Sequence, residues 1–217
     1  MRLNIINKRK IAVISKIKKS SNRLKFGLGT LALVSLCLLL LIIGTFTQLK
    51  YDITLPASSP VPIYHFEYIP QIPVVIFIAA LLGSRWGLFT VILYIALGLF
   101  SYYPVFGLGG GLSYIFQYNF GYIAAYIFAV YFSSKELKKK NFIISNISAV
   151  LYGVIIIHII GIIYFTITAI MKHDTISFIY DFIYYQSFSK ILYDVIFSII
   201  AMIIARSCRK LLWIING

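Results

Sequence analysis

Charged residues are scarce in this chain, and acidic residues are the scarcest of them. Only 6 of the 217 residues are Asp or Glu, against 20 Lys and Arg, and charged residues make up 12% of the total. A soluble domain of this length normally carries about twice that charged fraction. Because so little polar surface is available to face water, lipid must solvate much of the chain.

The sequence also lacks the motifs of common enzyme and cofactor sites. It contains no phosphate-binding G-x-x-x-x-G-K-[ST] loop, no H-E-x-x-H and no Ser/His/Asp or paired-carboxylate set. Its two cysteines, Cys37 in an apolar run and Cys208 in a basic tail, lie too far apart in the predicted topology to form a disulfide. We therefore expect no catalytic activity, no metal and no bound cofactor.

What the sequence has in abundance is apolar residues, which make up 60% of it. They gather in six runs, and at 1.5 Å per residue most of these runs are long enough to cross a bilayer as helices. The sequence thus predicts an all-α integral membrane protein of six transmembrane helices, with spans at about 26–49, 69–82, 86–102, 113–132, 142–171 and 189–205. These form one membrane domain, 26–205, between a basic segment, 1–25, and a basic tail, 206–217.

The basic residues indicate the orientation. If the N-terminus is inside, 17 of the 20 basic residues fall in inner segments, and only Lys50, Lys172 and Lys190 remain outside. Such asymmetry places both termini in the cytoplasm, and it explains the net charge of +14 by topology and anionic lipid rather than by nucleic acid. Segment 1–25 is either an amphipathic helix on the inner leaflet or a solvated tail.

Ionisable residues at membrane depth are costly and usually functional. Lys190 and Asp194 are four residues apart at the outer end of the sixth predicted span, so they share a helix face. Lysine in a first turn opposes the helix dipole, which makes sense if an anionic ligand binds there; the alternative is a plain interfacial ion pair. His158, midway in the fifth span, is more typical of a hydrogen-bonded packing residue than of a ligand.

Polar and glycine-rich residues mark a second candidate region. Gln117 and Asn119 are predicted inside the fourth span, where their amides need a partner in another helix or in a ligand. The preceding stretch, 102–111, contains Gly110 among its four glycines and permits close backbone approach to a ligand. Some of the aromatic residues nearby face a site and the rest face lipid.

Several motifs recur in an order that resembles the BioY family of biotin transporters. They are a Pro70-Gln71-Ile72-Pro73 start, a Leu81-Leu82-Gly83-Ser84-Arg85-Trp86-Gly87 turn, a Tyr94-Ile95-Ala96-Leu97-Gly98 helix, a Pro104-Val105-Phe106 exit and a Phe120-Gly121-Tyr122 element. The similarity covers about residues 68–132 and is weaker through the last helix. The sequence departs from the family where Val75-Ile76-Phe77 replaces a threonine-leucine-glutamine run. It departs again where Lys190 precedes Asp194 rather than following an aspartate.

The resemblance implies a six-helix bundle, the substrate-binding S component of an energy-coupling factor transporter in the cell membrane. Biotin would bind from the outer side. A separate transmembrane coupling protein and two cytosolic ATPases would drive its release, so ATP would be hydrolysed by partner subunits. Small residues on the first helix often contact the coupling protein in this family, and Gly29, Ala32 and Ser35 recur every three residues here.

Biotin has a ureido ring, an apolar sulfur-containing ring and a carboxylate tail, and a pocket for it needs matching groups. We assign Asn119, Gln117 and Asp194 to the ureido group and Lys190 to the carboxylate. The apolar walls would come from Phe106, Tyr118 and Tyr122. Two alternatives stay open: an S component for another vitamin, such as thiamine or riboflavin, and a structural membrane subunit without a small ligand. A membrane enzyme would need a catalytic set that the sequence does not offer.

Overall fold

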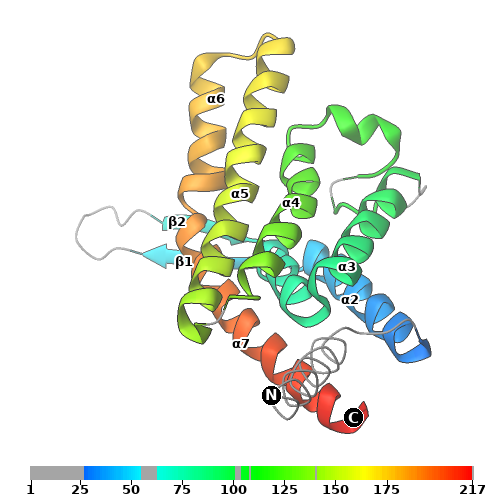
Figure 1. The fold of residues 1–217 in the computed structure, drawn as a ribbon. Helices are drawn as coiled ribbons and strands as arrows, with labels where there is room; N and C mark the ends of the chain where they lie inside the picture. Colours follow the sequence, from blue (N-terminus) through cyan, green and yellow to red (C-terminus); the bar gives the residue numbers. More distant parts are fainter. Residues whose placement is uncertain (1–26, 55–62, 101–103, 108, 140, 217) are drawn as a thin grey trace, which may run out of the picture. The chain divides into compact units, whose positions relative to one another are not determined.

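The computed structural model describes residues 27–54, 63–100, 104–107, 109–139 and 141–216, which are mostly helical (Figure 1). The amphipathic helix considered for segment 1–25 lies outside these residues. The elements are α2 (Leu28–Phe46), β1 (Leu49–Thr54), β2 (Ile63–Tyr68), α3 (Gln71–Phe100), the 3-10 helix η1 (Leu112–Phe116), α4 (Phe120–Glu136), α5 (Phe142–Met171), α6 (Ile176–Ile183), the π-helical turn η2 (Tyr184–Phe188) and α7 (Ile191–Asn216). The chain divides into two units, residues 1–33 and 34–217, and the features below belong to the second.

The structure is almost entirely helical, as predicted, but it also contains one small sheet that was not predicted. β1 and β2 form an antiparallel two-stranded sheet between α2 and α3, with Leu49 paired to Tyr68 and Lys50 paired to Glu67. The ammonium of Lys50 lies 3.5 Å from the carboxylate of Glu67. Because Leu49 enters the sheet, α2 ends at Phe46, three residues before the predicted end of the first span.

The second and third predicted spans form one helical stretch, α3, which is broken at Gly83. This glycine has φ 75° and ψ −172°, a conformation that side-chain-bearing residues rarely adopt. The predicted gap between residues 82 and 86 is therefore confirmed as a break in the helix. The guanidinium of Arg209 on α7 donates to the carbonyl of Ala80 at 3.1 Å, which satisfies one backbone acceptor freed by the break.

The fifth predicted span matches α5 at both ends. The side chain of Asn141 accepts a hydrogen bond from the backbone N–H of Ile144 and so caps the start of the helix. The buried face of α5 contains small residues that let α4 approach closely. A Cβ atom on Gly161 would lie 2.3 Å from the ring of Tyr122, so this contact requires glycine.

The fourth and sixth spans differ from their predicted bounds. α4 begins at Phe120 rather than near residue 113, because the chain first forms η1 and then leaves it at Gln117 in an extended conformation. The sixth span was predicted to cover 189–205, but α7 runs to Asn216. The helical turns of α6 and η2 before it were not predicted.

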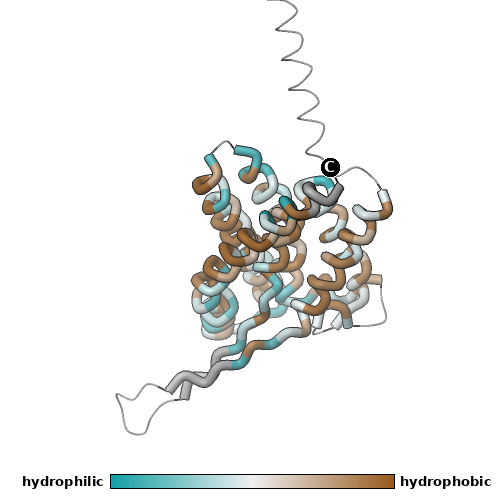
Figure 2. The backbone as a smooth tube through the Cα atoms, turned by 90° about the horizontal axis from the view of Figure 1, so that it is seen from below, coloured by the Kyte–Doolittle hydropathy of each residue, from teal (hydrophilic) through white to brown (hydrophobic). Residues whose placement is uncertain are grey.

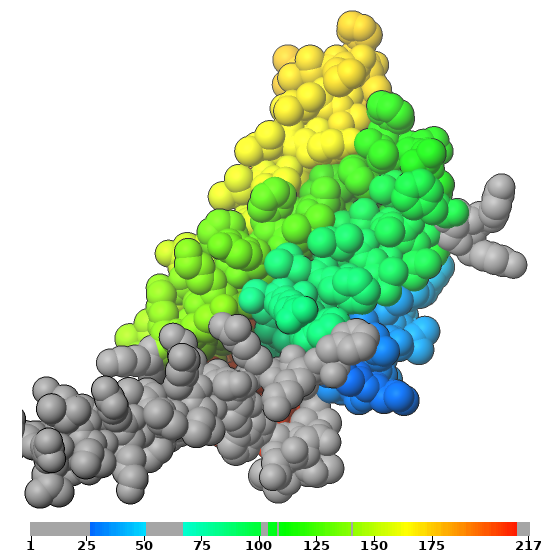
Figure 3. Space-filling model, turned by 45° about the vertical axis from the view of Figure 1, so that its right-hand side comes forward, coloured from blue at the N-terminus to red at the C-terminus, as the bar shows by residue number. Residues whose placement is uncertain are grey.

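The outer surfaces of the helices are apolar. On α5, Ile159, Ile163 and Ile167 are each more than half exposed, while Ile157 and Phe165 on the opposite face are fully buried. Figure 2 shows hydrophobic residues along most of each helix, and Figure 3 shows α5, α4 and α3 side by side. An apolar exterior of this kind is typical of helices that contact lipid.

Within the described residues, four helical stretches are long and apolar enough to cross a membrane: Leu28–Phe46, Gln71–Phe100, Phe142–Met171 and Ile176–Leu211. The fold is therefore a helical membrane bundle. The predicted count of six spans treats the two halves of α3 separately and adds the 17-residue α4, and it stays a prediction.

Candidate ligand-binding site

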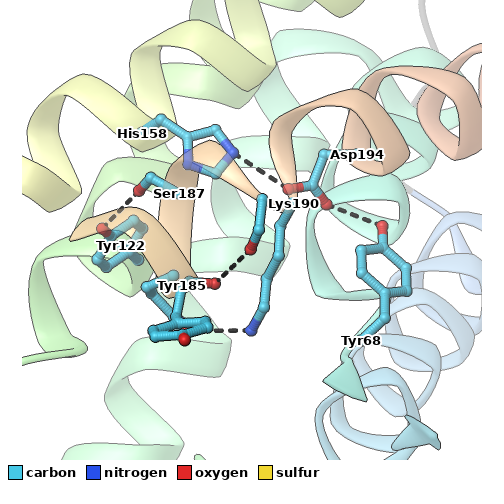
Figure 4. A network of polar contacts seen from close by, with 9 residues as sticks. Tyr68, Tyr122, His158, Tyr185, Ser187, Lys190 and Asp194 are labelled. Carbon is cyan, nitrogen blue, oxygen red and sulfur yellow. Dashed lines mark hydrogen bonds and ion pairs between the residues drawn. The ribbon is translucent and has the colours of Figure 1, made fainter. Parts of the chain in front are cut away.

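A buried carboxylate, that of Asp194, lies at the start of α7. The residue is 2% exposed, and both oxygens of its side chain have partners. The hydroxyl of Tyr68, at the end of β2, donates to Oδ1 at 2.8 Å, and Nε2 of His158 on α5 lies 3.1 Å from Oδ2 (Figure 4). Three elements far apart in the sequence thus meet at one carboxylate, which retains further lone pairs for a ligand donor.

His158 is 3% exposed and uses only one of its two ring nitrogens within the described structure. Its Nδ1 atom is buried and has no hydrogen-bond partner among the described residues. The interpretation of His158 as a hydrogen-bonded core residue is therefore correct for Nε2 and leaves Nδ1 unexplained. Buried polar atoms of this kind are rare enough to need a reason.

Tyr122 lies beside this pair and is held by the π-helical turn. Its hydroxyl and that of Ser187 in η2 are 2.7 Å apart, and its ring meets the ring of His158 edge to face at 6.2 Å between centroids. Short π-helical turns often occur at functional sites, because the extra residue redirects side chains. Here the turn places Ser187 in the interior while its neighbours remain exposed or half-buried.

Lys190 and Asp194 share the start of α7, as predicted, but they have different partners. The ammonium of Lys190 is half-buried and donates to Oε1 of Gln186 at 3.1 Å, whereas Asp194 bonds Tyr68 and His158. The simple interfacial ion pair considered from the sequence is therefore wrong. Both charges remain near one another, so this end of α7 offers a cation and an anion to a polar ligand.

A second buried polar cluster joins α2, α3 and α4. Gln71 donates through Nε2 to Thr45 at 2.7 Å and accepts through Oε1 from the hydroxyl of Tyr126 at 2.8 Å. The hydroxyl of Tyr94 lies 2.9 Å from Thr45 Oγ1. These residues were not predicted as site residues. Gln71 nevertheless has a recognisable signal in the sequence, because it is an amide at the start of an apolar run.

Gln117 and Asn119 do not lie inside a helix, so the prediction that placed them there is wrong. Gln117 is exposed where η1 ends, and Asn119 occupies the N-terminal cap position of α4. The Oδ1 atom of Asn119 is buried and has no hydrogen-bond partner in the described structure. Asn119 thus retains an acceptor for a ligand, whereas Gln117 is exposed.

Tyr118 belongs to an aromatic cluster formed with Phe165, Phe178 and Phe182, where α5 meets α6. Its hydroxyl donates to Asp174 at 2.7 Å, and the ammonium of Lys172 lies 4.0 Å from its ring centroid. The hydrogen bond to the Asp174 carboxylate raises the pKa of Tyr118, which therefore stays a neutral donor. Its ring and hydroxyl contact these neighbours, not Asp194 or Lys190.

Phe106 is buried beside the second polar cluster. Its ring centroid is 5.5 Å from that of Tyr94 and 4.7 Å from that of Tyr114. Gly110 follows in the glycine-rich loop and is half-buried, and the next residue, Gly111, donates its N–H to the carbonyl of Gly98 at 2.8 Å. A backbone hydrogen bond therefore holds the loop against the second half of α3. The buried ring of Phe106 offers apolar surface to a binding pocket.

A family model described as the BioY family matches residues 16–213, nearly the whole chain. The chain belongs to the BioY family. The family suggested by the motifs is thereby confirmed. This BioY-family chain is 34% identical over 111 residues to the probable biotin transporter BioY of Lysinibacillus sphaericus. That match covers 48% of this chain and 53% of the relative, so it spans about half of each.

The fold of the BioY-family chain also resembles a solved structure. The crystal structure of the S-component for biotin from an ECF-type ABC transporter superposes with a TM-score of 0.64 at 22% sequence identity. The likeness covers 84% of this chain and 91% of the other. At this identity the comparison supports the helical fold and not the role of single residues.

Proposed function

We propose that this BioY-family chain is the biotin-binding membrane subunit of a vitamin importer. It captures biotin from the outer side and passes it inward with a separate ATP-driven module. The observation that carries this proposal is the family match over residues 16–213. The partial match to a probable biotin transporter and the fold of a biotin S-component agree with it.

The chemistry of the buried polar groups supports biotin as the ligand. Asp194 supplies a carboxylate acceptor for a ureido N–H, and the Asn119 side chain has an unused buried oxygen. Lys190 supplies a cation for the carboxylate tail, and Tyr122 and Phe106 supply apolar surface. The remaining proposed contacts are Gln117, Tyr118 and Gly110. Of these, Gln117 is exposed.

The proposed topology has six spans with both termini in the cytoplasm. The positions of the basic segments support it. Arg209 in α7 bonds Ala80 near the break that precedes Arg85, and Arg206 bonds Asn146 at the start of α5, just after the lysines of 135–140. These contacts bring together three of the segments assigned to the inner side, those around Arg85, 135–140 and 206–210, in agreement with the asymmetry of positive charge.

The proposed partners are a transmembrane coupling protein and two cytosolic ATPases, in the cell membrane. The sequence has no phosphate-binding loop of its own, so the energy must come from other chains. In this proposal, residues 26–205 form the membrane domain. The segments 1–25 and 206–217 lie on the cytoplasmic side, next to anionic lipid.

A thermal-shift assay on detergent-purified protein tests the proposal with a panel of biotin, thiamine and riboflavin. A ligand that binds the folded state raises the apparent stability by mass action, in proportion to the logarithm of its concentration over Kd. We expect biotin alone to raise Tm. A shift with another vitamin instead would indicate a different S component, and no shift with any of them would favour a structural subunit.

A further inference from the structure

His158 has one ring nitrogen, Nε2, that lies beside Asp194, and a second, Nδ1, without a partner among the described residues. Figure 4 shows the His158 ring between Ser187 and Asp194, in the region that also contains Lys190 and Tyr122. Nδ1 is buried, and no described residue offers it a hydrogen bond. The neighbouring polar side chains bond other groups: Tyr122 bonds Ser187, Lys190 donates to Gln186, and Tyr68 donates to Asp194.

The contacts of Asp194 define what Nδ1 can do. We assign the imidazole proton to Nε2, because this atom lies 3.1 Å from Oδ2 of Asp194 and a carboxylate oxygen accepts hydrogen bonds. In a neutral imidazole the other nitrogen is then a bare acceptor. The atom that pairs with Nδ1 must therefore be a donor, such as the N–H of a ligand.

We propose that His158 contacts the ligand directly, with Nδ1 accepting a hydrogen bond from a ureido N–H of biotin. At the same time its Nε2–H holds the Asp194 carboxylate in place. The inference rests on the proposed function. It adds His158, a residue on α5, to the proposed ligand contacts on α4 and α7, and it gives the buried Nδ1 acceptor a hydrogen-bond donor.

Two substitutions distinguish the two roles that His158 could have: direct contact with the ligand through Nδ1, and a hydrogen bond to Asp194 through Nε2. In His158→Gln the longer amide brings its nitrogen close to the position of Nε2, which preserves the bond to Asp194 and removes the acceptor at Nδ1. In His158→Asn the shorter amide reaches only the position of Nδ1, and the bond to Asp194 is lost. His173→Asn, at an exposed residue of the loop after α5, is the matched control.

Biotin affinity is measured by calorimetry for the wild type and all three variants. Direct contact predicts that His158→Gln binds biotin about tenfold more weakly, the usual effect of one lost hydrogen bond. His173→Asn should bind like the wild type. If His158 only supports Asp194, His158→Gln will bind like the wild type and His158→Asn alone will be weak, which overturns the proposal.

A biotin derivative methylated on a ureido nitrogen allows a double-mutant cycle, in which the affinity lost through the methyl group is compared between the wild type and His158→Gln. Of the two mono-methylated forms, one loses the N–H that Nδ1 accepts, and its loss of affinity should not add to that of His158→Gln. Full additivity with both forms would overturn the direct contact. Wild-type protein that does not bind biotin at all would instead overturn the proposed function, and with it this inference.

If the variants do not fold, the same contact can be tested in the wild-type protein by nuclear magnetic resonance. Protein labelled with ¹⁵N-histidine has three imidazoles, and His65 and His173 act as internal references. We expect the Nδ1 resonance of His158 to have the shift of a bare nitrogen without ligand and to move upfield when biotin donates to it. An unchanged resonance at saturating biotin would overturn the proposal.

Discussion

Nε2 of His158 lies 3.1 Å from Oδ2 of Asp194, and this buried pair joins α5 to α7. Tyr68 completes it by donating to the other carboxylate oxygen at 2.8 Å. A carboxylate that accepts two bonds is held in one orientation before any ligand arrives. In a binding protein, such preorganisation lowers the cost of ordering the site.

The first prediction concerns this carboxylate. Asp194→Asn keeps the shape of the side chain but removes the charge and one acceptor oxygen. Because hydrogen bonds to charged groups contribute more than neutral ones, we expect biotin to bind about tenfold to a hundredfold more weakly. Calorimetric titration measures the loss. Asp181→Asn, at an exposed carboxylate of α6, is the control and should leave binding unchanged.

The second prediction concerns the ammonium of Lys190. Lys190→Ala should weaken biotin about tenfold or more, because a charge-assisted contact with the carboxylate tail is lost. Biotin amide, which has no carboxylate, should lose much less. Equal losses for both ligands would refute the assignment. Lys50→Ala removes an exposed ammonium paired with Glu67 and serves as the matched control.

The third prediction concerns the contact of Phe106 with α3. A Cβ atom on Gly98 would lie 2.1 Å from the Phe106 ring, so Gly98→Ala must displace that ring. Overpacking of this kind costs about 1–3 kcal/mol, which thermal unfolding in detergent detects as a lower Tm. The double substitution Gly98→Ala with Phe106→Leu reduces the clash. If the double variant is no more stable than Gly98→Ala alone, the contact is not the cause.

The fourth prediction concerns orientation across the membrane. Lys138 and Lys172 are exposed and lie on either side of α5, so the proposed topology places them in the cytoplasm and outside, respectively. In a Cys208→Ser background, an impermeant maleimide applied to intact cells should label Lys172→Cys and not Lys138→Cys. Permeabilised cells should label both. The reverse pattern in intact cells would invert the topology.

Local patterns in the sequence predict the elements whose bounds depend on local chemistry. α5 has the predicted bounds because a capping asparagine precedes one continuous apolar run. The break in α3 falls at Gly83 because only glycine readily adopts its backbone conformation. The family could also be recognised from the sequence, because several short motifs follow one another in the order typical of the BioY family.

The π-helical turn and the buried contacts depended on the tertiary structure. The strands were different, because residues 49–54 alternate apolar and polar side chains and residues 63–68 place an aromatic ring at every second position, which is a strand signal in the sequence itself. Gln117 and Tyr118 looked like helix residues because aromatic and apolar neighbours surround them in the sequence, yet the helix begins only at Phe120.

The sequence by itself determined that this chain is a helical membrane protein and which family it belongs to. Composition and order of residues are enough for these properties, because they depend on solvation and on local backbone preference. The tertiary structure alone decided that Asp194 pairs with His158 and Tyr68, residues 36 and 126 positions away in the chain. Such contacts are decided by how the helices pack, since burial forces distant polar groups to find one another.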